Sequence, residues 1–466
     1  MNIHEFYRSE IIRHRLAQYC GGKSDDPDTF TTAYLVGVSE RMVKEHISEE
    51  YFYSADKKSF YWLLEKEVDL FRSVWDMENV LGVLDVEYFN LVHPGDAYWN
   101  ARRTYEAMEP VYQILLRTFQ DFGISPLCIM TGQGYHFSFQ VPLAQKDDIK
   151  KLAEIGKIEE SLKGKYNSTH GRRTRKVDIE YGLAFDGMGR LIEYIGHLMF
   201  KALEKEYKGM PVVFTDTAIG GNKKEAISID LSMYGDPVFM RDIRCPFSLY
   251  QKHKIFKYKF GESTARAIPT LITLPRYAPN MPELLKIRTN FDAAVEYAGS
   301  SDTTIPTAAG GLERLINSYK RSSLYKFHKY FDSAEHDPHY LWPKTYDRFD
   351  TSTIPPCVAH CLREPNPHIL RPTNLQTLTR VLMKMGWHPK HIAGLVRSKL
   401  ERNYQWGPQW FKYDAPTRAN FYIRIFSGLV DTGVDREEDL NCFSHAEKGY
   451  CWKPACGWNL ADYRKK

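Results

Sequence analysis

Hydrophobic and polar residues alternate in three parts of the chain, and this period of two predicts β-strands. Residues 78–89, ENVLGVLDVEYF, form the first of them. Residues 124–141, ISPLCIMTGQGYHFSFQV, read as two strands joined by a turn at Gly132-Gln133-Gly134. Residues 225–234, EAISIDLSMY, form the third. One face of such strands is apolar, so they are expected to lie in a sheet that packs on a core.

Between these segments lie stretches with helical periodicity. Residues 96–123 predict a long amphipathic helix that ends at Gly123, and helices are expected near 145–163 and 186–207. PVVFTD, residues 211–216, reads as a further strand. The order strand, helix, strand, strand, helix, strand predicts an α+β core, with a sheet covered on one face by helices.

The flanking segments read as mainly helical. Residues 1–75 are aromatic-rich and are expected to form a helical cap on the sheet. Residues 373–404 predict two helices, with Thr373 as the cap of the first and Pro389 in the first turn of the second. Residues 299–311, GSSDTTIPTAAGG, are small and polar, which is typical of a linker.

Composition narrows the class of protein. The chain has 466 residues, 43% hydrophobic and 26% charged, with a net charge of +5. This length predicts two or three domains. No segment approaches the roughly 20 apolar residues of a membrane-spanning helix, and the charged N-terminus lacks the apolar core of a signal peptide. A cytoplasmic protein that does not enter a membrane is therefore expected.

The first predicted strand carries two acids on one face. Asp85 and Glu87 are two residues apart and share that face with Val83. Neighbouring carboxylates in an apolar strand repel each other and resist burial, and a bound divalent cation resolves both problems. Oxygen ligands suit Mg²⁺ or Mn²⁺. The alternative is a strand edge with two solvated acids.

A third acid, Asp230, shares a face with Ser228 in the 225–234 strand. If this strand lies beside the 78–89 strand, Asp85, Glu87 and Asp230 converge on one or two metal ions. Such an arrangement is common in enzymes of phosphoryl transfer.

The hairpin adds a histidine to this picture. His136, Ser138 and Gln140 form its polar face. If that face is the carboxylate face, His136 lies at the substrate end of the metal site. The glycines at 132 and 134 allow the backbone to approach phosphate oxygens closely. The alternatives are a plain hairpin and an ordinary core or surface histidine.

The ordered motifs resemble those of the archaeo-eukaryotic primase catalytic subunit and the related primase-polymerases. That family has an acid-x-acid strand, a hairpin with small residues before a histidine, and a later hydrophobic-Asp strand. Here Asp85-Val86-Glu87, Gly132-Gln133-Gly134-Tyr135-His136 and Ile229-Asp230 match them. The resemblance covers about residues 78–260 and implies a core with an RNA-recognition-motif-like sheet.

The resemblance also implies roles for single residues. Asp85, Glu87 and Asp230 would hold the metals, while His136 and the turn at Gly132, Gln133 and Gly134 would contact the nucleotide's phosphates. The family's basic stretch after the last motif is similar to Arg244-Cys245-Pro246-Phe247-Ser248-Leu249-Tyr250-Gln251-Lys252. There Arg244, Ser248 and Lys252 would line the triphosphate or ribose, and Tyr250 stands where the family usually has histidine.

Two basic stretches are candidates for nucleic-acid contact. QKHKIFKYKFG, residues 251–261, mixes lysines and a histidine with aromatic residues, a composition suited to a nucleic-acid backbone and stacked bases. GRRTRK, residues 171–176, is a second basic cluster that could touch template phosphates. Solvated surface is the alternative for both.

The last quarter of the chain carries five of the eight cysteines. Cys357, Cys442, Cys451 and Cys456 offer four thiolates, enough for a 4Fe–4S cluster or a zinc ion, and Cys361 could substitute for Cys357. A Pro-Pro-Cys, helices and a late cysteine trio look like the C-terminal domain of the primase large subunit, which carries an iron–sulfur cluster and helps bind the initiating nucleotide. Buried free thiols are the alternative.

Three domains and one function follow from these observations. Residues 1–298 would form the catalytic domain (core about 78–275), 299–350 a linker and helical connector, and 351–466 a helical, cysteine-bearing domain. The expected activity is that of a nucleotidyltransferase: a DNA primase, with DNA polymerase activity as a further option, using single-stranded DNA and NTP or dNTP, with Mg²⁺ or Mn²⁺. A replicative helicase is a further candidate partner, and a mobile genetic element a candidate origin.

Two other functions stay open. The first is a metal-dependent nuclease or nicking protein, with Tyr135 and Tyr250 as candidate nucleophiles. The second is a non-catalytic iron–sulfur or zinc protein that binds nucleic acid.

Overall fold

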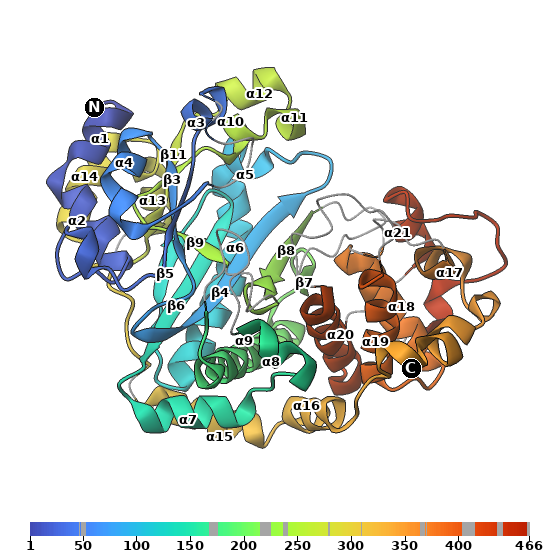
Figure 1. Cartoon of the computed structure of the whole chain (residues 1–466). Helices are drawn as coiled ribbons and strands as arrows, with labels where there is room; N and C mark the ends of the chain where they lie inside the picture. Colours follow the sequence, from blue (N-terminus) through green and yellow to red (C-terminus); the bar gives the residue numbers. More distant parts are fainter. Residues whose placement is uncertain are drawn as a thin grey trace.

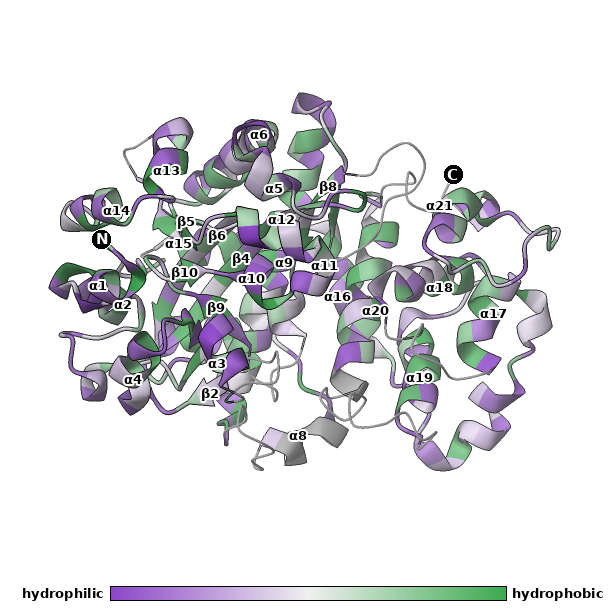
Figure 2. Cartoon of the chain, turned by 90° about the horizontal axis from the view of Figure 1, so that it is seen from above, coloured by the Kyte–Doolittle hydropathy of each residue, from purple (hydrophilic) through white to green (hydrophobic). Residues whose placement is uncertain are grey.

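A computed structural model of the chain describes residues 1–45, 47, 53–166, 176–214, 225–235, 241–277, 280–308, 310–363, 369, 371–402, 415–435 and 441–463. Both helices and antiparallel sheets are present, so the α+β class is confirmed (Figure 1). The helices carry hydrophobic and hydrophilic residues side by side along their length (Figure 2), as amphipathic helices do. None of the described helices is long and apolar enough to cross a membrane.

The central sheet has six strands in the order β12-β5-β6-β4-β8-β7. β4 lies in the middle and pairs antiparallel with β6 on one side and β8 on the other. The condition set above for the three acids, that the strands carrying them lie side by side, is therefore met. The strands span Asn79–Asn90 (β4), Leu127–Met130 (β5), Gly134–Pro142 (β6), Val212–Phe214 (β7), Glu225–Asp230 (β8) and Leu274–Pro275 (β12).

Helices cover one face of this sheet, as predicted. α6 (Ala101–Asp121) and α9 (Ile179–Glu206) pack against each other, and α9 packs on β4. The ring of Tyr112 on α6 lies 4.7 Å from that of Tyr135 and 5.4 Å from that of Phe137, centroid to centroid. The apolar side of the hairpin therefore faces the helices, and His136 points to the opposite face. Short helices flank this layer: α5 (Asp96–Trp99), α7 (Lys146–Ile155) and α8 (Glu160–Tyr166).

The N-terminal part contains a second sheet, so the prediction that residues 1–75 are helical is wrong in part. Its four strands run in the order β2-β1-β3-β9. They are short and mostly buried on both faces, so they lack the alternation that identifies a strand, and the partner of β3 comes about 170 residues later. The elements are α1 (Ile3–Arg8), α2 (Glu10–Tyr19), β1 (Leu35–Val38), α3 (Glu40–Lys44), β2 (Tyr53–Ala55), α4 (Phe60–Glu65), β3 (Asp69–Ser73) and β9 (Asp242–Arg244).

The segment expected to be a linker is packed against the central sheet. The backbone N–H of Gln140 donates to the carbonyl of Pro306, and the N–H of Ala308 donates to the carbonyl of Gln140. Thr303 and Ile305 are buried. This segment extends the sheet where β5 no longer covers β6. Before it come β10 (Leu249–Tyr250), α10 (Lys252–Ile255), α11 (Lys257–Phe260), α12 (Glu262–Ala267), β11 (Leu271–Ile272), α13 (Met281–Ile287) and α14 (Phe291–Gly299).

The C-terminal part is helical, as predicted (Figure 1). Pro389 opens its helix as expected, but Thr373 is not a cap: Pro372 already occupies the first helical turn and Arg371 is the cap residue. The helices are α15 (Gly311–Lys320), α16 (Ser323–Ser333), α17 (Pro356–Arg363), α18 (Pro372–Lys384), α19 (Pro389–Leu400), α20 (Ala415–Thr432) and α21 (Cys442–Glu447).

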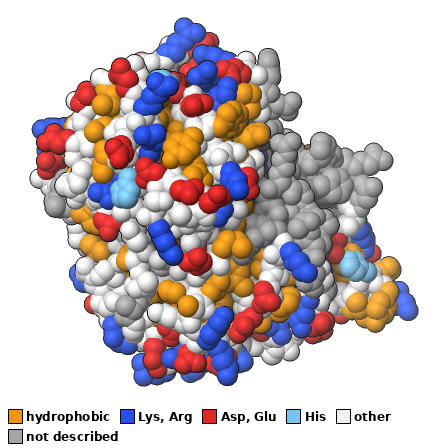
Figure 3. All heavy atoms as spheres, turned by 60° about the vertical axis from the view of Figure 1, so that its left-hand side comes forward, with side chains coloured by type: hydrophobic (Ala, Val, Ile, Leu, Met, Phe, Trp, Pro, Cys, Tyr) orange, Lys and Arg blue, Asp and Glu red, His pale blue; other side chains and the backbone are white. Residues whose placement is uncertain are grey.

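Acidic and basic side chains intermingle over the face of the molecule seen in Figure 3.

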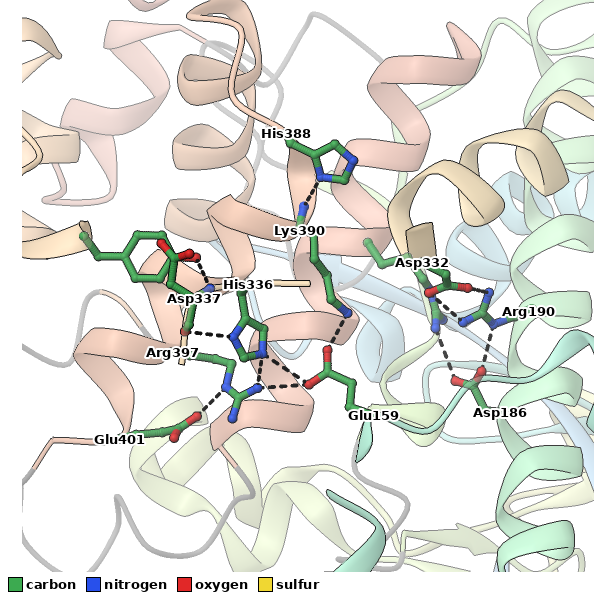
Figure 4. Close-up of polar contacts among 12 residues, drawn as sticks. Glu159, Asp186, Arg190, Asp332, His336, Asp337, His388, Lys390, Arg397 and Glu401 are labelled. Atoms are coloured by element: carbon green, nitrogen blue, oxygen red, sulfur yellow. Dashed lines mark hydrogen bonds and ion pairs between the residues drawn. The ribbon is translucent and has the colours of Figure 1, made fainter. Parts of the chain in front are cut away.

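A seam of ion pairs joins the C-terminal helices to the first part of the chain (Figure 4). Arg190 on α9 pairs with Asp186 and with Asp332 on α16, 2.7 Å in each case. Further along, the Glu159 carboxylate meets the Arg397 guanidinium at 2.9 Å and also contacts the Lys390 ammonium. Cavities of about 60 and 420 Å³ lie along this seam.

Glu193 is the most deeply buried acid of the seam, at 1% exposure. Its carboxylate lies 3.3 Å from both the His328 ring and the Arg424 guanidinium. Burial alone would raise its pKa, but the His328 ring and the Arg424 guanidinium lower it to about 2.

We expect Glu193→Gln to reduce the free energy of unfolding by about 1–3 kcal/mol at pH 7, because Arg424 loses one charged partner in the interior and keeps the other, Asp186 at 3.2 Å. A carboxyl whose pKa is depressed in the folded state stabilises above its unfolded pKa. The difference from wild type should therefore shrink as the pH falls from about 4.5 toward 2. Urea unfolding at several pH values measures it. Glu204→Gln, exposed on the same helix, is the control, and a pH-independent difference would contradict the prediction.

Candidate functional site

Strand register places a histidine and a second acid on either side of Asp85. Across β4 and β6, Asp85 is opposite His136, and across β4 and β8 it is opposite Asp230. Glu87 lies two residues further along the same face, opposite Gly134 and Ser228. Directly opposed residues in antiparallel strands have Cβ atoms about 5 Å apart. The structure thus brings the three predicted carboxylates and His136 to one face of the sheet.

Asp85 and His136 form the deep part of the site. Their side chains are 12% and 9% exposed, and His136 Nε2 lies 3.3 Å from Asp85 Oδ1. This contact is not a hydrogen bond, because Asp85 Oδ1 has no hydrogen-bond partner among the described residues. The other ring nitrogen, His136 Nδ1, is likewise buried without a partner in the described part of the chain. Buried polar atoms are normally satisfied, so these two are available to a ligand.

Glu87 and Lys252 form the open part of the site. The Glu87 side chain is 37% exposed, and its Oε1 lies 3.9 Å from Lys252 Nζ. Burial raises the pKa of Glu87, Lys252 opposes this, and the negative charges of Asp85 and Asp230 raise it further. Asp230 accepts hydrogen bonds from the N–H and the hydroxyl of Ser232, at 2.8 and 3.0 Å. The site therefore collects negative charge that the protein compensates only in part.

The donor set fits a hard divalent cation. Three carboxylates face one region, and Asp85 Oδ1 has no other partner. As the side chains stand, the described residues contain no group of three or more His, Cys, Asp or Glu that could hold a metal ion. Ligation would therefore include side-chain rotation of Glu87 or of Asp230, which would leave Ser232.

The glycines of the turn make room for protein atoms. A side chain at Gly134 would overlap the carbonyl of Val86 on β4, and one at Gly132 would overlap the Tyr250 ring. We expected these glycines to admit phosphate oxygens, but packing alone already requires them. The turn is held by the N–H of Thr131, which donates to the carbonyl of Gly134.

Arg244 and Ser248, two of the predicted nucleotide-binding residues, make contacts within the protein interior instead of facing the carboxylates. Arg244 pairs with Asp69 at 2.6 Å, and its guanidinium lies 4.3 Å from the centres of both the Phe71 and Tyr250 rings. The Ser248 hydroxyl is fully buried and accepts a hydrogen bond from the backbone of the second sheet. Of the basic stretch, Lys252 is the residue that reaches the carboxylates.

Sequence reasoning missed a buried polar network beside the turn. The Tyr98 hydroxyl lies 3.0 Å from the side-chain oxygen of Gln133 and 3.2 Å from the Tyr250 hydroxyl. Arg288, at the end of α13, is 1% exposed and faces the carbonyls of the turn. No motif marks Tyr98 or Arg288, since they come from separate helices and meet the hairpin only in the folded chain.

The basic stretches are only partly available to nucleic acid. Lys254 and Lys257 contact Thr270 and Glu40, while Tyr258 is 68% exposed. Of GRRTRK, residues 171–175 lie outside the described residues.

The four predicted cysteines meet in the C-terminal part. Cys357 at the start of α17 and Cys442, Cys451 and Cys456 of the tail line one small cavity of about 20 Å³. Burial raises the pKa of Cys357 to about 12, and nearby Cys442 and Cys451 add to the effect. Four cysteine sulfurs are the donor set of a zinc ion or an iron–sulfur cluster. As the side chains stand, these described cysteines do not form a group that could hold a metal ion, so ligation would require them to move closer together. Cys361 is buried one turn further along α17 and does not line the cavity.

Comparison of the chain with protein-family models, with curated proteins and with solved structures finds no match. The functional argument therefore depends on the geometry described above.

Proposed function

We propose that this protein is a nucleotidyltransferase that synthesises a nucleic-acid strand on a single-stranded DNA template, as a DNA primase. The observation that carries this proposal is the register of β4, β6 and β8, which sets His136 and Asp230 against Asp85, with Glu87 beside them. The connectivity β4-α6-β5-β6-α9-β8 and the order β5-β6-β4-β8 are those of a split βαβ sheet, which supports an RNA-recognition-motif-like core.

The reaction joins the 3′ oxygen of a primer or first nucleotide to the α-phosphorus of an incoming nucleotide. The bond between the α-phosphorus and the bridging oxygen breaks, and pyrophosphate leaves. Asp85, Glu87 and Asp230 would hold Mg²⁺ or Mn²⁺, which neutralises phosphate charge and activates the attacking hydroxyl. Lys252, at the open side of the site, would bind the triphosphate.

His136 is suited to donate to a phosphate oxygen. Its Nδ1 has no hydrogen-bond partner, and its ring is fixed in a strand interior beside Asp85. An imidazole nitrogen that carries its proton is a hydrogen-bond donor, and a phosphate oxygen is an acceptor. A rigid donor placed where phosphate charge develops lowers the barrier to phosphoryl transfer.

We further propose that the cysteine cavity holds an iron–sulfur cluster, with zinc as the alternative. Cys357, Cys442, Cys451 and Cys456 would be the ligands. In a primase this domain would hold the first nucleotide, so that synthesis starts without a primer.

A synthesis assay tests the proposal. Purified protein is incubated with circular single-stranded DNA, Mg²⁺ or Mn²⁺, and labelled ribonucleotides or deoxyribonucleotides. We expect products that require template, triphosphates and free metal, and that EDTA abolishes. Labelled DNA shortened or joined covalently to the protein, with no extension, would favour the nuclease instead.

The positions of the two candidate nucleophiles, Tyr135 and Tyr250, do not favour a nicking protein. Tyr135 is fully buried on the helix side of the sheet, where its hydroxyl accepts a hydrogen bond from Arg276 at 3.0 Å. Tyr250 is 3% exposed and bonded to Tyr98. Neither hydroxyl is placed to attack DNA at the carboxylates.

A further inference from the structure

Arg288 places a buried positive charge behind the hairpin that carries His136. Its guanidinium is 1% exposed, and it forms no ion pair with any residue that the structure describes. Instead, Nη1 and Nη2 donate to the carbonyls of Thr131 and Gly132, at 3.4 and 3.3 Å. The Tyr105 hydroxyl donates to the same Thr131 carbonyl at 2.7 Å. Both carbonyls are thus held toward the interior.

This arrangement determines where the next two amides point. A peptide bond is planar and trans, so the N–H of Gly132 lies opposite the Thr131 carbonyl, and the N–H of Gln133 opposite the Gly132 carbonyl. Neither N–H donates to an acceptor in the described part of the chain. Two adjacent amides therefore face away from Arg288 without partners.

The outer side of the turn adjoins the open part of the carboxylate site. Gly134, the last turn residue, is opposite Glu87, whose carboxylate lies 3.9 Å from the Lys252 ammonium. An anion in front of the turn would meet two amide donors and a lysine. The buried Arg288 guanidinium, which has no counter-ion among the described residues, makes an anion at this place more favourable, because its electric field is poorly screened in the protein interior.

We propose that Arg288 is a positioning residue that orients and polarises the Gly132 and Gln133 amides to bind an anionic group of the substrate. The inference rests on the proposed function for the identity of that anion, the triphosphate of the incoming nucleotide. Arg288 itself does not touch the substrate. It acts through two peptide groups and through its charge.

Variants of Arg288 and the nucleotide dependence of synthesis test this inference. Arg288→Met keeps the bulk and removes charge and donors, and we expect it to raise KM for the nucleotide about 10-fold with little change in kcat. Arg288→Lys keeps the charge but not the paired donors of the guanidinium, so it should recover only part of the loss. Tyr105→Phe removes a donor to the same carbonyl without removing charge, so its effect should be smaller. A KM equal to wild type in Arg288→Met overturns the inference.

Tripolyphosphate binding to the full chain separates this inference from the proposed function. Calorimetry should show binding to wild type that is about 10-fold weaker in Arg288→Met. Binding that depends on Arg288 in a protein that makes no product would refute the primase proposal alone. Absence of wild-type binding refutes the inference. If Arg288→Met does not fold, a folded Arg288→Lys decides: its intermediate affinity supports the role, and an affinity equal to wild type overturns it.

Discussion

Replacing Asp85 with asparagine is expected to lower the rate of nucleotide incorporation by about 10³-fold or more, while the protein becomes no less stable. Asparagine keeps the shape of the side chain but removes one negative charge from the centre of the cluster. That charge also contributes to the raised pKa of Glu87, so its loss relieves repulsion in the folded state. A residue that costs stability and is needed for activity is typical of a catalytic site.

Two measurements check this prediction. Initial rates on single-stranded template give the loss of activity, and thermal unfolding with and without Mn²⁺ gives the stability. Wild type should gain stability on adding Mn²⁺, and Asp85→Asn should gain much less. Asp121→Asn, on the exposed end of α6, is the matched control and should behave as wild type. Near-normal synthesis by Asp85→Asn would contradict the proposal that Asp85, Glu87 and Asp230 bind the catalytic metal.

The second large effect is expected at the cysteine cavity. Cys357→Ser should abolish the metal content of the purified protein, because Cys357 joins α17 to the three cysteines of the tail. The free energy of metal binding at such a site also stabilises the folded state. The C-terminal part of Cys357→Ser should therefore become sensitive to protease. Elemental analysis and visible absorption measure the metal and distinguish an iron–sulfur cluster from zinc.

Cys361→Ser is the control for this experiment. Cys361 lies on the same helix as Cys357, is buried and does not line the cavity. Its variant should keep the metal of the wild type. A wild-type protein that contains no iron or zinc after anaerobic purification would instead mean that the four cysteines are free thiols.

In the central sheet, β4 and β6 could be recognised from the sequence because they are long, but the pairing of β4 with β8 entered only as a condition. The apolar face of β6 packs against α6, while α9 packs on β4, so the alternation along β6 made the side on which His136 lies predictable. β1 and β3 could not be predicted, since short strands that are buried on both faces show no period, and β2 has only three half-buried residues. Residues 299–311 were expected to form a linker because they are small and polar, but in the structure Thr307 pairs with Gln140 at the free edge of β6.

For the site, the sequence alone determined which residues carry its chemistry: the acids on β4, the acid that ends β8, the histidine after the turn and the four cysteines. Residue types and a period of two are local properties, so they are visible along the chain. Tertiary structure decided that Asp230 and His136 flank Asp85, that Ser248 is buried away from them, and that Arg288 supports the turn. These facts depend on register and on packing between distant segments, and side-chain patterns along one segment do not encode either.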